Sequence, residues 1–413
     1  MSQAGTGKKA LFIGGAAIAL LLMAWLGYGL YVYWRNPVPT FELPPAPPAL
    51  PNNAYPQIIE CAAQIREAGK LAAMEQLPNY GTLQQKQEVI EANRTLLQKI
   101  RSILPKPAQV IHLEYQTGDP TMDNYRNIAR LFVAEAKLYE QQGKYGHALS
   151  SYLDGFTFLE KVLNGGNVLQ LTYHFMGSIP LFQSAHSLLP KLSAQEALEG
   201  ARRLEQLIAN EYPLSTLLAQ DFRSWLTGWQ RIVRGQSMRG FRLDLPKSDL
   251  ERDILYMPKQ PLSKAAQQYA QMWLDQAKLP FPEQRVIEYP PALQQLGRDL
   301  VVRMPDDIAL QVARYTYVRT RLRLLYTALR LEAYRKARGR YPASLKDLGN
   351  SPYFIDPFSN KPFVYRPQGN GYVLYSLGPN SIDDGGTPFP EGKLNRAQPG
   401  DIGLVPNFPS RPS

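Results

Sequence analysis

The stretch PDDIALQVARYTYVRTRLRLLYTALRLEAYRKARGRYP, residues 305–342, decides the fold. Asp306 and Asp307 suit the N-terminal end of a helix, where the helix dipole favours negative charge, and Gly339 and Pro342 are residues that end helices. The stretch therefore predicts one long helix, which at about 1.5 Å per residue extends roughly 50 Å.

Short runs of strand-forming residues follow this helix. They are PFVYRP (362–367) and GYVLYSLG (371–378), and turn-forming residues, DPFSNKP and QGNG, precede and separate them. We therefore expect a long helix plus a short sheet in a C-terminal module, residues 304–413.

The order of motifs in residues 324–406 resembles the head of the type II secretion major pseudopilins. The matching residues are Tyr334, Gly339, Tyr341-Pro342, Asp356-Pro357, Tyr365, Tyr375-Ser376, Gly378 and Asp383-Asp384. The resemblance implies a long helix whose C-terminal half packs on a small antiparallel sheet. It also implies a bacterial envelope protein associated with secretion or pilus-like machinery. The N-terminal segment lacks the Glu of a pilin processing site, so filament incorporation through that segment is not expected.

The same resemblance implies a structural calcium site in the C-terminal loop. Acidic residues of this loop bind calcium in the pseudopilins, and Asp401 in GDIGLVP matches their last acidic position. The adjacent carboxylates of Asp383 and Asp384 repel each other, and a hard cation that accepts roughly six to eight oxygens would relieve the repulsion. We expect Asp383, Asp384 and Asp401 to bind the ion with backbone carbonyls near Leu377 and Asn380. The alternative is that Asp383 and Asp384 only cap turns.

The N-terminal region predicts a membrane anchor. Residues 10–33, ALFIGGAAIALLLMAWLGYGLYVY, carry no charge and as a helix exceed the roughly 30 Å hydrocarbon core. A cleaved signal peptide would have a shorter apolar region and a small-residue cleavage site, whereas aromatic residues such as Trp25 and Tyr28 end this segment. Lys8 and Lys9 precede it, so residues 1–9 should stay in the cytoplasm. We expect a single-pass protein of the bacterial inner (cytoplasmic) membrane, with most of the chain periplasmic or otherwise extracytoplasmic.

A proline-rich linker and an all-α middle domain should follow the anchor. Eight prolines in residues 34–56 favour an extended, semi-rigid spacer. Apolar spacings of three and four then predict an α-helical domain over residues 57–303. Its expected helices are 57–77, 83–103, 123–142, 146–163, 194–210, 214–233 and 263–277.

One hairpin in this domain, residues 123–163, contains a segment that resembles a single tetratricopeptide unit. In residues 134–156 the small residues Ala136, Gly143 and Ala148 allow two helices to approach, although Gly155 replaces the usual Ala of the second helix. A hairpin within an irregular α domain and a peptide-binding groove are both compatible with this pattern.

Composition excludes several classes of protein. Cys61 is the single cysteine, so no internal disulfide forms, and the four histidines lack metal-ligand spacing. The net charge is +11, and the long helix is its most basic part. Arg319, Arg323 and Arg330 could meet anionic headgroups or acidic wall polymers, or they could pair with acids of the middle domain. Nucleic-acid binding is not expected, because no basic-aromatic sheet motif is present.

These observations predict a structural or interaction protein of the envelope, not an enzyme, with other envelope proteins as partners. No nucleophile, phosphate-binding or dinucleotide-binding motif is present. One alternative is an envelope hydrolase or transferase that uses His174, Glu160 and Asp154, which a carboxylate of strongly raised pKa in a cleft would support. The other is a peptide-binding receptor, which requires a concave groove with exposed Tyr and Asn side chains.

Overall fold

The computed structural model describes residues 21–31, 36–37, 39–40, 42–110, 122–233, 259–285, 287–294, 308–390 and 394–404. These residues are mainly helical, with one two-stranded antiparallel sheet near the C-terminus, which confirms the mainly α fold class. The chain forms two compact units. The larger comprises residues 44–224, 272–287 and 305–413, and the smaller comprises residues 1–43, 225–271 and 288–304.

The first part of the larger unit is a series of helices. They are α2 (Tyr55–Ala63), α3 (Ala68–Met74), α4 (Leu83–Ala92), α5 (Arg94–Ile103), α6 (Met122–Gln141), α7 (Tyr145–Leu163), α8 (Val168–Ala185) and α9 (Ala194–Ala209), with the 3₁₀ helix η2 (His186–Lys191) between the last two. Two further helices, α10 (Leu214–Val233) and α12 (Lys259–Gln276), have residues in both units.

Two of the predicted helices are each divided in two. The predicted helix 57–77 breaks before α3, where Glu67 adopts a left-handed backbone conformation. The predicted helix 83–103 breaks at Asn93, whose side-chain oxygen accepts a hydrogen bond from Arg66 N at 2.9 Å and whose amide donates to Arg66 O at 3.0 Å. Asn93 therefore ties the two breaks together, because a side chain that bonds to remote backbone competes with a continuous helix.

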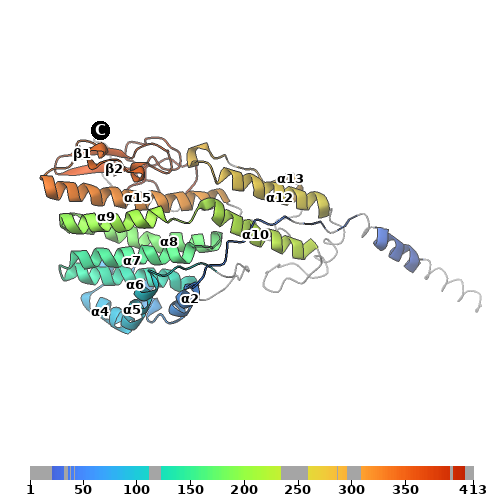
Figure 1. The fold of residues 1–413 in the computed structure, drawn as a ribbon, viewed down its shortest axis with the longest axis horizontal. Helices are drawn as coiled ribbons and strands as arrows, with labels where there is room; N and C mark the ends of the chain where they lie inside the picture. Colours follow the sequence, from blue (N-terminus) through green and yellow to red (C-terminus); the bar gives the residue numbers. More distant parts are fainter. Residues whose placement is uncertain are drawn as a thin grey trace, which may run out of the picture. The chain divides into compact units, whose positions relative to one another are not determined.

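The larger unit is arranged in layers (Figure 1). α6 and α7 form the predicted hairpin, α8 packs on both of them, and α3 and α4 cover α6. α9 packs on α7, and α15 (Ile308–Arg338) packs on α8 and α9. Gly200 of α9 permits this approach, because a Cβ atom there would lie 2.5 Å from Leu149 of α7 and 3.4 Å from Leu329 of α15.

The predicted long helix is α15, and neighbours cover it on more than one face. α8 and α9 lie on one side, and strand β2 (Gly371–Tyr375) packs on it together with the 3₁₀ helices η4 (Leu345–Leu348) and η5 (Pro352–Phe354). β2 pairs antiparallel with β1 (Val364–Gln368). The larger unit thus extends across the predicted boundary at residue 304. The reason is that α15 packs on α8 and α9 of the middle region and also on the sheet.

Residues of the C-terminal motifs bond to one another around Asp356. Its fully buried carboxylate accepts hydrogen bonds from the Ser359 and Ser376 hydroxyls, both at 2.7 Å, and from the backbone N–H groups of Phe358 and Leu377. Burial raises the pKa of Asp356 even though these four donors oppose the change. The Asp356 side chain therefore joins the loop before β1 to the end of β2.

The predicted proline linker makes specific contacts with the larger unit. The carbonyl of Pro44 accepts a hydrogen bond from the Arg223 guanidinium at 2.7 Å, and that of Pro45 accepts one from the Gln220 amide at 3.2 Å. Asn53 bonds in both directions to the backbone of Gln109. Residues 44–53 therefore lie along the helical unit and are not a free spacer.

The predicted membrane span, residues 10–33, falls largely outside the described residues, which include only 21–31 of it. Those residues are helical. Within the part of the chain that the structure describes, no helix is both long and apolar enough to cross a membrane.

Candidate functional site

A buried ion-pair network joins three helices of the larger unit. Glu160 lies near the end of α7, His174 in the middle of α8, and Arg319 on α15. The two carboxylate oxygens of Glu160 accept hydrogen bonds from Arg319 Nη1 at 2.5 Å and from Nη2 at 3.0 Å. Glu160 Oε1 also lies 2.8 Å from His174 Nε2. Bidentate pairing fixes the relative positions of the helices as well as the charges.

Glu160 is held in its ionised form. Burial by itself would raise the pKa of Glu160, but the positive charge of Arg319, together with His174, outweighs burial and lowers the pKa to about 2. The pKa of Arg319 is raised, because Glu160 and other neighbours more than offset burial of the guanidinium. The pair is therefore charged throughout the physiological pH range.

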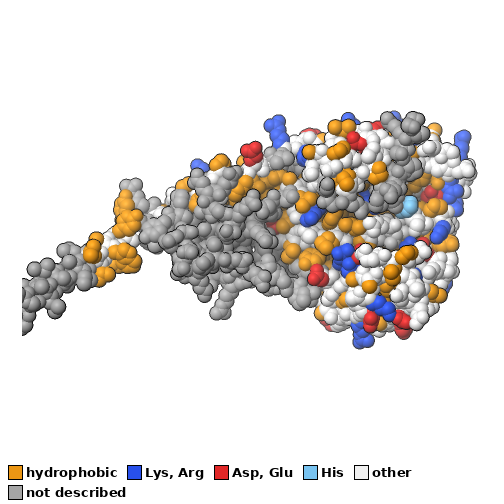
Figure 2. Space-filling view, turned by 180° about the vertical axis from the view of Figure 1, so that it is seen from behind, with side chains coloured by type: hydrophobic (Ala, Val, Ile, Leu, Met, Phe, Trp, Pro, Cys, Tyr) orange, Lys and Arg blue, Asp and Glu red, His pale blue; other side chains and the backbone are white. Residues whose placement is uncertain are grey.

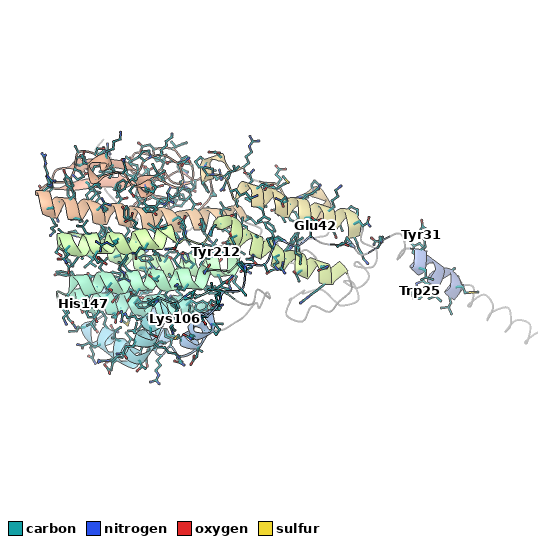
Figure 3. All side chains as sticks on the ribbon, viewed as in Figure 1. Trp25, Tyr31, Glu42, Lys106, His147 and Tyr212 are labelled. Atoms are coloured by element: carbon teal, nitrogen blue, oxygen red, sulfur yellow. The ribbon has the colours of Figure 1, made fainter. Side chains whose placement is uncertain are left out.

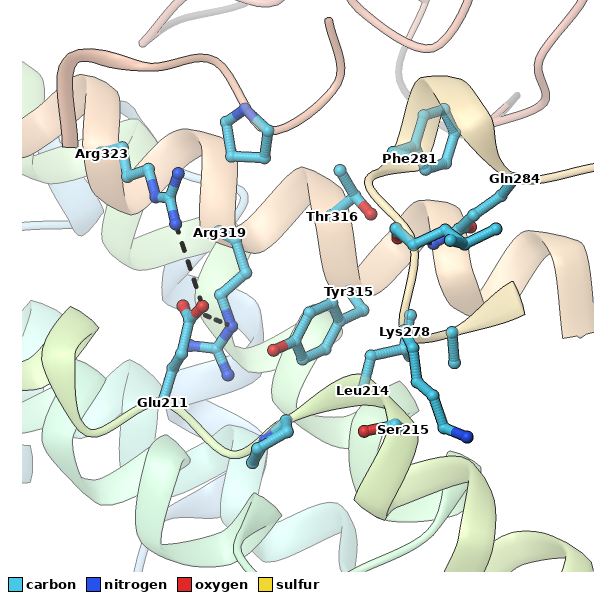
Figure 4. A pocket seen from close by; sticks show the side chains of 14 residues that line it. Glu211, Leu214, Ser215, Lys278, Phe281, Gln284, Tyr315, Thr316, Arg319 and Arg323 are labelled. Atoms are coloured by element: carbon cyan, nitrogen blue, oxygen red, sulfur yellow. Dashed lines mark hydrogen bonds and ion pairs between the residues drawn. The ribbon is translucent and has the colours of Figure 1, made fainter. Parts of the chain in front are cut away.

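A cavity of about 500 Å³ lies beside this network, between the start of α10, the segment after α12 and the middle of α15 (Figure 4). Its polar lining includes Glu211, Arg319 and Arg323, and its apolar lining includes Leu214 and Phe281. Pockets of this size and mixed composition hold small ligands in many proteins. The cavity is the candidate functional site of the larger unit.

Tyr315 shapes the wall of the cavity next to the charges. Its ring lies under the guanidinium of Arg319, 4.8 Å from ring centre to carbon, and its hydroxyl donates to the carbonyl of Tyr212 at 2.9 Å. Burial raises the pKa of Tyr315 to about 12, so this hydroxyl stays protonated. The tyrosine therefore holds the Arg319 side chain at the cavity edge.

The three residues of the hydrolase or transferase alternative do not form one site. His174 and Glu160 contact each other, but neither lines the cavity, and His174 is only 2% exposed. Asp154 belongs to a different cluster, where it accepts hydrogen bonds from Arg101 at 2.8 Å and Arg203 at 2.7 Å. The pKa of Glu160 is lowered and not raised, so Glu160 is not the carboxylate of raised pKa that the alternative required.

The predicted calcium ligands lie near one another in the C-terminal loop. One oxygen of Asp401 accepts a hydrogen bond from Gly386 N at 2.6 Å, the other lies 3.4 Å from Asp384 N, and Asp384 accepts from Gly400 N at 2.6 Å. Asp383 accepts from Gly385 N at 3.0 Å. In these bonds the carboxylates accept from backbone N–H groups of the loop, as the turn-capping alternative predicted. Among the described residues, no group of three His, Cys, Asp or Glu side chains is placed to hold a metal ion.

The basic residues predicted to meet an anionic surface bond within the molecule. Arg319 is 2% exposed and bonds to Glu160, so the interpretation of this residue as part of a basic surface is wrong. Arg323 donates to the carbonyl of Ile355 at 3.2 Å, and Arg330 donates to that of Leu348 at 2.6 Å. On the face shown in Figure 2, basic and acidic side chains are interspersed. Arg319 instead pairs with an acid of the middle region, as the alternative predicted.

The hairpin of α6 and α7 does not present the residues that a peptide groove requires. Tyr152 is fully buried, and its hydroxyl donates to Glu140 at 2.7 Å. Asn164 donates to the carbonyl of Ala108, and Asn167 caps the start of α8. α8 packs against both helices of the hairpin. These contacts support the hairpin alternative over the groove.

No protein-family model, curated protein or solved structure matches this chain.

Glu211 carries the carboxylate of the cavity, and it was not among the candidate site residues that the sequence indicated. It lies in the short connection between α9 and α10, beside Asn210, where an acidic residue looks like an ordinary solvated one. Arg319 could have pointed to an acidic partner such as Glu211, because a charged residue on an apolar helix face needs a partner of opposite charge.

Proposed function

We propose that the protein is a membrane-anchored interaction protein of the bacterial envelope, with its compact units outside the cytoplasm. The observation that carries the proposal is the helix at residues 21–31, whose large apolar side chains are all exposed: Leu21, Leu22, Met23, Trp25, Leu26, Tyr28, Leu30 and Tyr31. Trp25 is 69% exposed, and the side chains of Trp25 and Tyr31 extend from the helix (Figure 3). Water is a poor solvent for such a surface, and lipid is a good one.

The charged clusters of the larger unit support an interaction role over catalysis. The Glu160 and Asp154 clusters connect α5, α7, α8, α9 and α15 through charge-assisted hydrogen bonds. They keep the packed helices in register, which is a structural role. A link to secretion or pilus-like machinery is the partner class that the C-terminal resemblance favours.

Topology reporters test the anchor. A reporter active only outside the cytoplasm, fused after Ser413, should be active in the full-length protein. The matched control replaces Leu22 and Leu26 with Arg, because each charge at the centre of a span costs about 2.5–3.5 kcal/mol and should stop insertion. Cytoplasmic reporter activity of the unchanged protein, or a mature N-terminus near residue 35, contradicts the proposal.

Crosslinking tests the interaction role. The full-length protein should crosslink in intact cells to another envelope protein and should co-purify with it from solubilised membranes. A variant that replaces only residues 1–35 with an unrelated anchor should keep the partner, because the compact units carry the contact. Recovery of the protein with no crosslinked partner under either anchor contradicts an interaction role.

We also propose that the C-terminal loop binds calcium, and the environment of Asp401 favours this second function. Burial raises the pKa of Asp401 to about 6, two backbone hydrogen bonds oppose the change, and the charges of Asp383 and Asp384 add to it. A bound cation would remove the repulsion by exchanging some N–H bonds of the loop for metal–oxygen bonds.

Melting at two pH values tests the calcium proposal. The raised pKa means that protonated Asp401 stabilises the fold below about pH 4, and that this contribution is lost as the pH rises through 6. Calcium should therefore raise the melting temperature more at pH 7 than at pH 5, and Asp383→Ala with Asp384→Ala should remove the effect. Equal melting with calcium and with chelator at both values excludes the site.

A further inference from the structure

The cavity beside α15 contains charged groups whose hydrogen-bonding capacity is unused. Glu211 Oε2 lies 3.3 Å from Arg319 Nε, but the geometry is not that of a hydrogen bond, and both atoms are buried without another partner among the described residues. Arg323 Nε is also buried without a partner there, and the Arg323 Nη2 atom lies 3.9 Å from Glu211 Oε1. Buried polar atoms of native proteins are nearly always hydrogen-bonded, so these atoms indicate a missing binding partner.

The cavity atoms without a hydrogen-bond partner include both donors and an acceptor. Arg319 and Arg323 offer N–H donors, and Glu211 offers a carboxylate acceptor on the same side of the cavity (Figure 4). The donors and the acceptor are neighbours, because Glu211 lies 3.3 Å from Arg319 and 3.9 Å from Arg323. A ligand that satisfies both must therefore carry an anionic acceptor and an N–H donor on neighbouring atoms.

The remaining wall of the cavity is apolar. Leu214, Leu279 and Phe281 line it, and Pro213 and Pro357 extend the same surface. Phe281 is fixed by edge-to-face packing on Phe358, at 4.8 Å between ring centres, and by Arg396 above its ring at 4.0 Å. This wall suits an aliphatic or aromatic side chain, and a volume of about 500 Å³ leaves room for one or two amino-acid residues.

We propose that this cavity binds the α-amino carboxylate of a free apolar amino acid or of a short apolar peptide. The ligand carboxylate bonds to Arg323 and to Arg319 Nε, its ammonium or amide N–H group bonds to Glu211, and its side chain lies on Leu279 and Phe281. Arg319 stays in place because Glu160 holds its two Nη atoms, so only its Nε faces the ligand. This proposal does not depend on the membrane anchor, because every lining residue belongs to the larger unit.

Calorimetry and melting of the full-length protein in detergent micelles test the proposal. The ligands are leucine and leucyl-leucine, with N-acetyl-leucine and leucinamide as matched compounds that lack the ammonium or the carboxylate. Leucine or leucyl-leucine should raise the melting temperature and give a saturable heat. Leucinamide should bind at least about tenfold more weakly than the better of the two, because it leaves the guanidinium groups without an anion.

The two sources of the ligand give different results in the same experiment. For a free amino acid, leucine binds more tightly than leucyl-leucine and N-acetyl-leucine binds about tenfold more weakly than leucine. For a peptide end, leucyl-leucine binds more tightly and N-acetyl-leucine keeps most of the affinity of leucine. Either pattern supports the proposal. Absence of binding by both leucine and leucyl-leucine, or equal binding of leucinamide, overturns it.

Three variants connect binding to the cavity. Arg323→Gln and Glu211→Gln should each weaken binding about tenfold, because each removes one charged partner of the ligand's polar groups. Leu279→Trp should weaken binding by filling the apolar side of the cavity. Leu279 is 39% exposed and the change alters no buried charge, so this variant should fold even if Arg323→Gln or Glu211→Gln does not. Arg202→Gln on the exposed face of α9 is the matched control and should bind as the unchanged protein does. Unchanged affinity in all three cavity variants places the ligand elsewhere and overturns the proposal.

Discussion

Single charged residues decide how the helices of the larger unit meet. Glu160 and His174 are visible in the sequence as polar residues within apolar helical stretches, but their roles depend on Arg319, which lies 159 positions further along the chain from Glu160. Sequence spacing cannot reveal a pair at such a separation, because only the tertiary fold brings the two side chains together. The same limit explains why Arg319 looks like a surface residue in the sequence and is a buried one in the fold.

Glu160→Gln should strongly destabilise the protein. The lowering of the Glu160 pKa from 4.5 to about 2 corresponds to about 3 kcal/mol of folding free energy, and the two Nη atoms of buried Arg319 would lose their carboxylate partner. The ionised Glu160 stabilises the fold above pH 4.5, and this contribution is lost as the pH falls towards 2. Unfolding of both proteins by urea across pH 2–7 measures the difference, which should be largest at neutral pH and should shrink below pH 4.5.

Glu199→Gln is the matched control for that experiment. Glu199 pairs with Arg202 on the surface of α9, and its side chain is 56% exposed. Exposed pairs of this kind contribute about 0–1 kcal/mol. A loss for Glu160→Gln no larger than that for Glu199→Gln would show that the buried pair does not stabilise the fold.

At the scale of elements, the sequence predicts helices best where one face is apolar and a cap is present. Predicted helices 146–163 and 194–210 correspond closely to α7 and α9, and a capping box of Ser193 and Glu196 starts α9. α8 was not among the helices that we expected. It contains Pro180 and is apolar around most of its circumference, because α6, α7 and α15 all pack on it, so a one-sided periodicity is absent.

Gly155→Ala should destabilise the contact between α7 and its neighbours. A Cβ atom at this position would lie 2.8 Å from Leu181 of α8 and 3.3 Å from Phe132 of α6. Overpacking of a core commonly costs about 1–3 kcal/mol, which thermal unfolding detects. Gly69→Ala on α3 is the control: it meets no atom within 4 Å and should stabilise the protein by up to about 1 kcal/mol. Equal stability of the two variants would contradict close packing at Gly155.

The proline segment should contribute to stability. A chain that begins at Pro44 should melt at a higher temperature than one that begins at Asn52, because the carbonyls of Pro44 and Pro45 accept hydrogen bonds from α10. Two such bonds contribute about 1–3 kcal/mol. Arg223→Ala should reduce the difference between the two chains, whereas a difference that Arg223→Ala leaves unchanged would mean that the segment acts through other contacts.

At the scale of the whole molecule, the sequence predicted the main content of the fold but not its division into units. The predicted boundary at residue 304 marks a real change of pattern, from a series of helices to α15 and the sheet. It does not mark the end of a compact unit, because the larger unit draws on three separate stretches of the chain. Sequence patterns show where elements change, whereas packing partners decide which elements form one core.

A chain that ends after Met304 should therefore lose cooperative folding. Without α15 the packing faces of α8 and α9 are exposed, and the Glu160 carboxylate loses its guanidinium partner. Circular dichroism should show helix content that melts gradually. A chain that ends after residue 406 is the control and should melt as sharply as the full-length protein. A sharp transition in the shorter chain would instead support an independent middle domain.

The packing of α9 against α15 also imposes an order in time. Residues 210–307 are made after α9 and before α15. At a synthesis rate of about 5–20 residues per second, this interval lasts on the order of ten seconds. During this time α9 has been made, but α15, its largest packing partner, has not. The larger unit can therefore complete its core only after α15 has been made, and the faces of α8 and α9 that α15 covers stay uncovered during the interval.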